Sequence, residues 1–311
     1  MKLTNKTQVE GYVYQHSLEK KVSGPNSNNP GTEYIAGNLD VLTDDAGVNV
    51  VTVHFSYVTA TTKNGKPNGT FTVLNDIIDG KIGNVMANGK DVAGKVSIDS
   101  AIGLNEFYTD RSGKEELVSA KRNEGGFVHA VSSINEDEKT RNTFECDIVI
   151  TGVSIREADE EKNLPEKAVV RGAIFDYSGA LLPVELSVIN PIAISYFTGL
   201  DASSKNPTFT KVKGRQISEV TVRKIVEEGA FGEPSVREVS NTRKDYVITW
   251  AAREPYAWDD ESTMTAQQLL KAMSDREIKL AEIKKRQDDW KAQKNQAPSA
   301  FSAPATGIYN F

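Results

Sequence analysis

The chain has 311 residues, of which 38% are hydrophobic and 26% charged, and its formal net charge is −6 at pH 7. That length allows two domains of about 100–150 residues each, and the acidic balance argues against a protein that holds duplex DNA through overall basicity, because phosphate contacts need Lys and Arg. The single cysteine, Cys146, cannot form a disulfide within the chain, so the fold requires no oxidising compartment.

The first residues, MKLTNKTQVEG, lack the apolar core of a signal peptide. No stretch reaches the roughly 18 uninterrupted apolar residues that a membrane span needs. We therefore expect a soluble, cytoplasmic protein without membrane contact.

Along the chain, strand-like segments recur in a consistent order. The paired stretches are TQVEGYVYQHSLEK with TFECDIVITGVSIRE, YIAGNLDVLTDD with VVRGAIFDYSGA, and PNGTFTV with KNPTFTKV. The last pair places Phe71 against Phe209, and a further match places Arg122 against Arg243. Several matches in one order at similar separations predict a duplicated domain.

The pattern after the second copy is helical. From Thr265 onward apolar residues recur at helical spacing, and Thr265 with Gln268 fits a capping box. The Pro/Ala/Ser-rich end of the chain is typical of a disordered tail. The predicted organisation is repeat 1 over 1–138, repeat 2 over 139–256, a C-terminal helix over 257–294 and a tail over 295–311.

Each repeat contains five or six alternating segments separated by Gly, Asn and Asp turns, which is typical of a β-sandwich or a β-barrel. In repeat 1 the segment after Phe71 is predicted to be a strand, followed by a short apolar segment ending at Gly89. A long strand then carries a polar hairpin at 110–113.

The stretches GTFTVL, ANGKDVAGKVSI and LNEFYTDRSGKEELVS resemble the single-stranded DNA-binding protein family. The resemblance implies a mainly β chain of two tandem OB-like β-barrels, followed by the C-terminal α-helix and a flexible tail. Bacterial members usually have one copy and an acidic tip, whereas this chain has two copies and ends in GIYNF. In that respect it is more similar to tandem-OB binders of phages and mobile elements.

The resemblance implies a protein that coats and protects single-stranded DNA, or RNA, in replication or recombination. OB barrels bind a strand by stacking bases on aromatic side chains beside a basic groove. The candidate residues are Lys63, Lys66, Phe71, Phe107, Tyr108, Arg111, Lys121 and Arg122 in repeat 1, and Tyr196, Phe197, Phe209, Lys211, Lys213, Arg215 and Arg243 in repeat 2. Replication or recombination proteins are expected to bind the tail through Phe301, Tyr309 and Phe311.

The sequence contains none of the phosphate-loop, nucleophile-elbow, HExxH or CxxC motifs that have a clear mechanism. The three histidines, His16, His54 and His129, stand singly in strand-like segments. We therefore expect no enzymatic activity, no cofactor and no metal.

Two other functions fit the same pattern. A virion or scaffold component would use the β domains and the helix for protein contacts. A carbohydrate-binding module would use an exposed tryptophan on a barrel, and Trp250 is the tryptophan that lies in a strand-like segment. A basic groove lined by aromatic residues favours strand binding, a flat apolar patch favours assembly, and a neutral aromatic cleft favours sugar.

Overall fold

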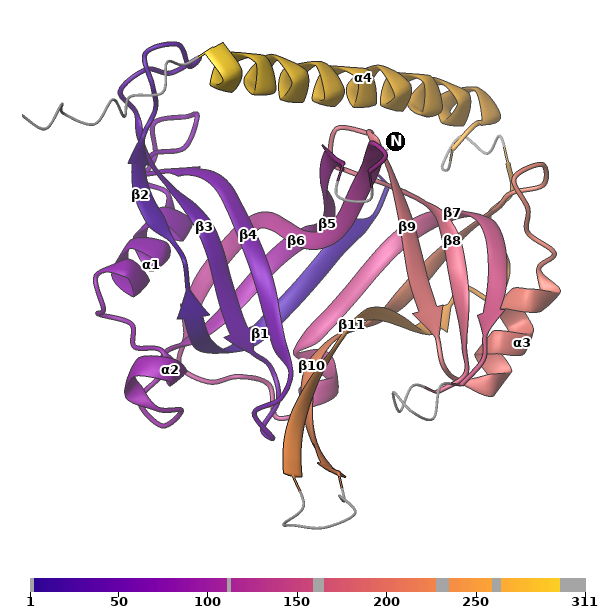
Figure 1. The fold of residues 1–311 in the computed structure, drawn as a ribbon, viewed down its shortest axis with the longest axis horizontal. Helices are drawn as coiled ribbons and strands as arrows, with labels where there is room; N and C mark the ends of the chain where they lie inside the picture. The colour runs from indigo at the N-terminus through magenta and orange to yellow at the C-terminus, as the bar shows by residue number, and fades with distance from the viewer. Residues whose placement is uncertain (1–2, 111–112, 159–164, 228–234, 259–263, 297–311) are drawn as a thin grey trace, which may run out of the picture.

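Among the described residues, eleven strands form one continuous sheet that closes into two barrels lying side by side (Figure 1). The computed structural model describes residues 3–110, 113–158, 165–227, 235–258 and 264–296, with the backbone alone at 220–227, 235–242 and 293–296. The predicted tail, including Phe301, Tyr309 and Phe311, lies outside the described residues.

The first barrel has the strand order of an OB fold. Its elements are β1 (Asn5–His16), β2 (Glu19–Val22), β3 (Glu33–Leu42), β4 (Val50–Thr59), α1 (Gly69–Ile78), α2 (Val85–Asn88), β5 (Lys95–Thr109) and β6 (Glu116–Val131). Strand β1 pairs with both β3 and β5, β3 pairs with β4, and β5 pairs with β6. A short parallel pairing of Val53 in β4 with Asn123 in β6 closes the barrel.

The second barrel repeats that order. Its elements are η1 (Glu138–Thr140) before the barrel, then β7 (Asn142–Arg156), β8 (Lys167–Phe175), β9 (Leu181–Val188), α3 (Pro191–Gly199), β10 (Thr208–Glu227) and β11 (Ser235–Ala251). Here the closing parallel pair is Ser187 in β9 with Val247 in β11. The predicted fold class, mainly β with two OB-like barrels and a C-terminal helix, is confirmed.

In each barrel a helix connects the third and fourth barrel strands. In α1 the Asn68 side chain accepts a hydrogen bond from the Thr70 backbone N–H, and Leu74 and Ile77 enter the core. The prediction of a strand after Phe71 was therefore wrong. The alternation in TFTV suits a strand, but the Asn68 cap and the helical spacing of the apolar residues decide the local structure.

Strand β1 of the first barrel and β7 of the second pair in antiparallel fashion from Asn5–Cys146 to Val9–Asn142, and this pairing joins the two barrels. The long hairpin of each barrel, β5–β6 in the first and β10–β11 in the second, also contacts the other barrel. Ile102 of β5 belongs to the core of the second barrel, and Asn49, just before β4, forms a bridge to Glu219 of β10. The barrels therefore share one sheet, and a strand of the first barrel contributes a side chain to the core of the second.

Buried polar side chains fix the angle between the barrels. The Asn123 amide donates to Gln216 Oε1 at 2.7 Å, and its Oδ1 accepts from the Tyr246 hydroxyl at 3.1 Å. The Gln216 carbonyl accepts from the Asn142 amide at 2.7 Å, and the Ser218 N–H donates to Asn49 Oδ1 at 2.6 Å. Because buried polar groups are stable only when paired, this cluster specifies one orientation of the joint.

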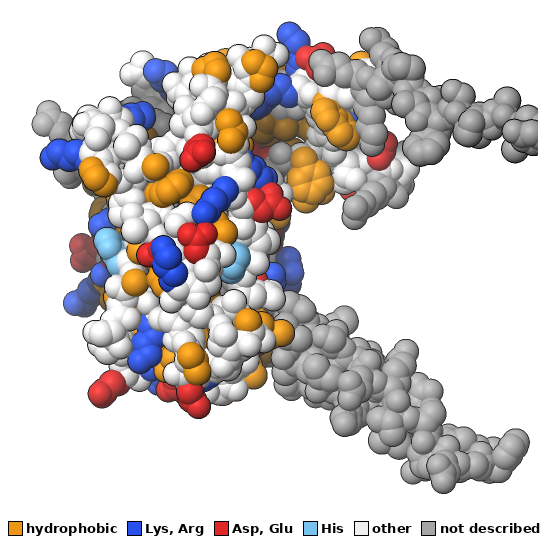
Figure 2. Space-filling model, turned by 90° about the vertical axis from the view of Figure 1, so that its left-hand side faces the viewer, with side chains coloured by type: hydrophobic (Ala, Val, Ile, Leu, Met, Phe, Trp, Pro, Cys, Tyr) orange, Lys and Arg blue, Asp and Glu red, His pale blue; other side chains and the backbone are white. Residues whose placement is uncertain are grey.

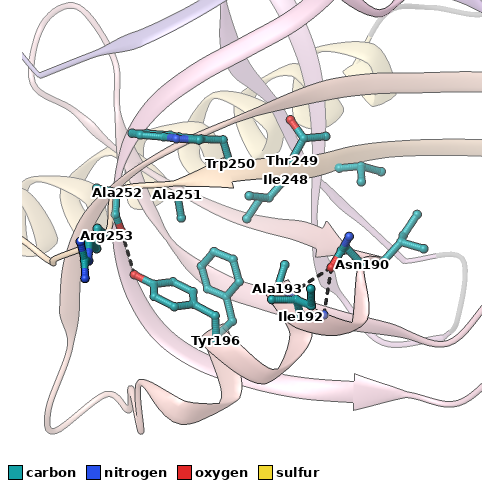
Figure 3. A pocket seen from close by; sticks show the side chains of 13 residues that line it. Asn190, Ile192, Ala193, Tyr196, Ile248, Thr249, Trp250, Ala251, Ala252 and Arg253 are labelled. Carbon is teal, nitrogen blue, oxygen red and sulfur yellow. Dashed lines mark hydrogen bonds between the residues drawn. The ribbon is translucent and has the colours of Figure 1, made fainter.

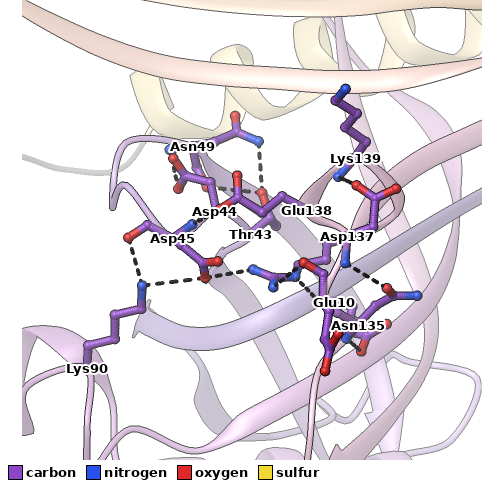
Figure 4. A network of polar contacts seen from close by, with 12 residues as sticks. Glu10, Thr43, Asp44, Asp45, Asn49, Lys90, Asn135, Asp137, Glu138 and Lys139 are labelled. Carbon is purple, nitrogen blue, oxygen red and sulfur yellow. Dashed lines mark hydrogen bonds and ion pairs between the residues drawn. The ribbon is translucent and has the colours of Figure 1, made fainter.

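Arg141, whose side chain is buried, fastens the connection between the barrels to the first barrel. Figure 4 shows the polar network around Asp45, Asn135 and Glu138 at this point. Its guanidinium donates to Asp45 Oδ1 at 2.9 Å and to the Asn135 carbonyl at 2.5 Å. The hydrogen bond from Arg141 holds the pKa of Asp45 below its ordinary value. The Asp45 N–H in turn donates to Glu138 Oε1 at 2.8 Å.

Helix α4 (Ala266–Gln296) runs over both barrels (Figure 1). The expected capping box is present, since the Gln268 N–H donates to Thr265 Oγ1 and the Thr265 N–H donates to Gln268 Oε1. Arg276 pairs with Glu106 of β5 and also donates to the Leu181 carbonyl of β9. None of the helices in the described part of the chain has the length and apolar character that a membrane crossing needs.

Candidate nucleic-acid interface

The joint between the barrels carries a groove of about 610 Å³ on the outer face of the sheet, which we call the junction groove. Residues of β1, β5, β7, β10 and β11 line it, together with Lys139 of η1. The charged and polar lining residues are Lys6, Thr7, Gln8, Asp99, Lys139, Thr143, Glu145, Lys213, Arg215 and Thr249. Four basic side chains and two carboxylates thus give the groove a basic excess in an acidic protein.

Three predicted residues, Lys211, Lys213 and Arg215, lie on one face of β10 because alternate strand residues point the same way. Lys211 and Lys213 both contact the Glu145 carboxylate, at 3.2 and 3.3 Å. Burial alone would raise the pKa of Glu145, but these two hydrogen bonds outweigh burial and lower the pKa. Glu145 thereby holds Lys213 at the groove and Lys211 next to it on β10. The Arg215 Nε donates to Asn142 Oδ1 at 3.2 Å.

Trp250 follows the groove-lining residue Thr249 and is 48% exposed. The register of β10 with β11 shifts between Lys213 and Gly214, which places Trp250 opposite Lys213. The Lys213 ammonium lies 5.3 Å from the centre of the indole ring. A bulge commonly redirects a side chain, and here it sets an exposed aromatic face beside a cation.

On its other side Trp250 borders a pocket of about 790 Å³ between α3 and β11, which we call the α3 pocket (Figure 3). Its walls are mainly apolar, with Ile192, Ala193 and Tyr196 on the helix side. The Tyr196 hydroxyl donates to the Ala252 carbonyl at 2.9 Å, so the predicted residue Tyr196 is half-buried and fixed in the pocket wall. The α3 pocket and the junction groove share Thr249, and Trp250 stands beside it.

The structure places three of the predicted aromatic contacts in or against a hydrophobic core. Phe71 is half-buried on α1 against the first core, and Phe197 of α3 is buried in the second. Phe209 shares the outer face of β10 with Lys211, but Tyr256 and Trp258 pack over it at ring-centroid distances of 4.9 and 5.8 Å. The sequence pattern gave no sign of the segment that covers Phe209.

The hairpin residues predicted in the first barrel have structural partners. The Lys121 ammonium contacts the Glu185 carbonyl and lies over the Tyr246 ring, and Arg122 pairs with Glu124 at 2.7 Å. Tyr108 lies under α4, where the Gln287 side-chain amide bonds both its N–H and its carbonyl. These residues hold the barrels and α4 together.

The other predicted residues stand apart from the junction groove. Lys63 and Lys66 are exposed in the turn before α1, Phe107 is 41% exposed on β5, and Arg243 is half-buried opposite Glu219. Arg111 lies outside the described residues. On the face seen in Figure 2, basic and acidic side chains are interspersed. In the first barrel, Lys20 and Asp79 form an ion pair of 2.8 Å, which offsets their charges.

Three residues of the candidate site were not among the predicted contacts: Lys6 and Lys139 in the junction groove, and Trp250 in the α3 pocket. Lys6 and Lys139 lie far from β10 in the sequence and reach the groove through the β1–β7 pairing and η1. Trp250 was noted as a strand residue, but its exposure depends on the bulge. In the described part of the chain no group of His, Cys, Asp or Glu side chains converges into a metal site.

A family model named YorF matches residues 3–286, so the chain belongs to the YorF family. No curated protein matches it in sequence. Two crystal structures of the single-stranded DNA-binding protein from Thermus aquaticus, a deletion mutant and the wild type, are similar in structure, each with a TM-score of 0.45 and 10% identity. The matches cover 84% and 83% of this chain and 98% and 96% of those chains. At that identity no residue role is carried over.

Proposed function

We propose that this protein binds single-stranded DNA along the junction groove and the α3 pocket, as a coating and protecting protein of replication or recombination. The observation that carries the proposal is the exposed Trp250 ring beside the Lys213 ammonium, where a basic groove meets an apolar pocket. Base stacking on an aromatic ring and cations along the phosphates are the two contributions that hold a single strand.

The roles follow from the chemistry of each side chain. Trp250 offers its ring to a base, and the α3 pocket beside it has room for a second. Lys6, Lys139, Lys213 and Arg215 lie where they can contact phosphates. These roles require binding alone, so we propose no enzymatic step.

The net charge of −6 favours a single strand over a duplex, and the basic excess of the junction groove supplies cations for the phosphates of that strand. A coating role in replication or recombination implies the cytoplasm of a bacterial cell, and we propose a phage or mobile element as the genetic context. RNA shares the stacking and phosphate chemistry and is the natural competitor in binding assays.

The test is fluorescence anisotropy of labelled poly-dT titrated with the full chain at low and moderate salt, beside a duplex of equal length. We expect salt-sensitive binding that prefers the single strand. Trp250→Ala should weaken it about 5- to 150-fold, which corresponds to the loss of one stacked base. Trp250→Phe should retain most of the affinity.

Charge variants separate groove contacts from overall charge. Lys213→Glu should weaken binding and reduce the slope of log K against log salt by about 0.7 or more, because at least one phosphate contact is lost. Lys81→Glu makes the same charge change at an exposed site outside the groove and should leave the slope unchanged. Absence of binding at low salt would refute the proposal and favour an assembly role for the barrels.

A further inference from the structure

Phe127 of β6 is 68% exposed, so its phenyl ring lies on the surface of the strand and not in the core. The two residues before it, Gly125 and Gly126, have φ angles of 66° and 114°. A side chain at Gly126 would collide with the Asp99 carbonyl, and the β5–β6 register shifts at this point. The bulge thus depends on glycine, and it lets Phe127 face outward while its neighbour Val128 is buried in the core.

The outward direction of Phe127 places it on the same sheet face as the junction groove. The register connects neighbouring strands in one row, in which Phe127 lies opposite Asp99, Asp99 opposite Gln8, Gln8 opposite Thr143, and Thr143 opposite Arg215. On the same face of β10, Lys213 then lies opposite Trp250. A continuous path therefore leads from an exposed aromatic ring on the first barrel to another on the second.

The length of this path sets the size of its ligand. Five strand spacings of about 4.8 Å separate β6 from β11, so the path measures about 24 Å along the sheet. At the roughly 3.4 Å rise of stacked nucleotides in one strand, about seven nucleotides would span it, and fewer if the strand is extended. A mononucleotide or a dinucleotide would reach one ring alone.

We propose that a single strand crosses the joint between the barrels, roughly perpendicular to the β-strands, with one base stacked on Phe127 and another on Trp250. This inference rests on the proposed function. It adds the direction in which the bound strand runs and a second stacking residue, Phe127. Between the two rings, Lys6, Lys213 and Arg215 contact phosphates, while Gln8, Thr143 and Asp99 face base edges. The Asp99 carboxylate can accept hydrogen bonds from the amino groups of bases, whereas it would repel a phosphate.

The proposal predicts a length threshold that depends on Phe127. Binding of labelled oligo-dT of 3, 4, 6, 8, 12 and 20 nucleotides to the full chain should strengthen sharply once the strand spans both rings, between about 4 and 8 nucleotides. Phe127→Ala should weaken binding of the 12-mer about 5- to 150-fold and should affect the 3-mer much less, because a 3-mer can still bind at Trp250. Phe127→Trp should preserve the threshold.

Tyr177 provides the matched control, because it is a fully exposed aromatic residue in the turn between β8 and β9, away from the path. Tyr177→Ala should bind every length as the wild type does. Thermal unfolding of Phe127→Ala should match that of the wild type, since its ring makes no core contact. A change in unfolding that accounts for the loss of binding would overturn the proposal.

The outcomes distinguish this inference from the proposed function. If Trp250→Ala loses affinity while Phe127→Ala binds all lengths like the wild type, the strand stays on the second barrel and the crossing is refuted. If neither substitution changes the affinity of a wild-type protein that does bind, both the crossing and the Trp250 site are refuted. A Phe127-dependent threshold between 4 and 8 nucleotides supports the crossing.

Discussion

The Glu106 carboxylate of β5 and the Arg276 guanidinium of α4 form an ion pair of 2.5 Å, in which the side chains are 4% and 11% exposed. Ser119 donates a further hydrogen bond to Glu106 at 2.7 Å, and Arg276 also reaches the Leu181 carbonyl. This pair therefore joins the helix to a strand of each barrel.

Removing one partner of this pair should release α4. Arg276→Ala leaves the nearly buried Glu106 carboxylate unpaired, and breaking a buried pair in this way costs about 3–5 kcal/mol. Hydrogen exchange should show faster exchange throughout α4 while the barrel strands stay protected. Glu106→Gln with Arg276→Met removes both charges and should restore much of the protection; protection of α4 in Arg276→Ala equal to the wild type would contradict the assignment.

Docking of α4 should also weaken in acid. Burial would raise the pKa of Glu106, but the hydrogen bonds from Arg276 and Ser119 outweigh it and hold the pKa below the ordinary 4.5. Because the pKa of Glu106 is lower in the folded state, the stabilisation that its carboxylate gives to the docked helix is complete above about pH 4.5. It is lost as the pH falls through the lowered pKa. Proteolysis confined to α4 should increase in that range, and Glu106→Gln should remove the pH dependence.

The polar cluster at the joint should tolerate little change. Asn123→Ala deprives the Gln216 side-chain carbonyl and the Tyr246 hydroxyl of a partner and should lower the free energy of unfolding by about 1–3 kcal/mol. Asn105→Ala makes the same change at an exposed position of β5 and should have little effect. Urea unfolding measures both variants, and equal losses in the two would show that the cluster contributes nothing specific.

Phe209 should contribute to stability and not to strand contact. Its ring is fully buried under Tyr256 and Trp258, so Phe209→Ala should cost about 3–5 kcal/mol in the free energy of unfolding. Under conditions where the variant is folded, its affinity for poly-dT should match that of the wild type. A variant of normal stability that binds weakly would place Phe209 back at the interface.

The sequence predicted those features that depend on local order. Alternation and turn residues indicated a duplicated β-sandwich or β-barrel, and the resemblance to the single-stranded DNA-binding protein family implied that the barrels are OB-like. The Thr265 and Gln268 pair was enough for the start of α4. The TFTV alternation was misleading at Phe71, because the Asn68 cap that begins α1 is a weaker signal in sequence than a run of strand-forming residues.

The candidate site was harder to predict because it depends on contacts between distant segments. Lys213 and Arg215 were identified from their charge, whereas Lys6 joins them through the β1–β7 pairing. The exposure of Trp250 depends on a register shift, and the burial of Phe209 depends on residues nearly fifty positions later in the chain. Periodicity identifies residues that share a face but not what covers that face.

The pairing of β1 with β7 makes the joint between the barrels and the junction groove one and the same structure. A ligand that occupies the groove must therefore stabilise the joint by the amount that mass action gives for its concentration and affinity. Any change that loosens the joint, even at a buried residue such as Asn123, must in turn weaken binding. If the groove binds a strand as proposed, the stability of the joint and the affinity for that strand are therefore linked quantities.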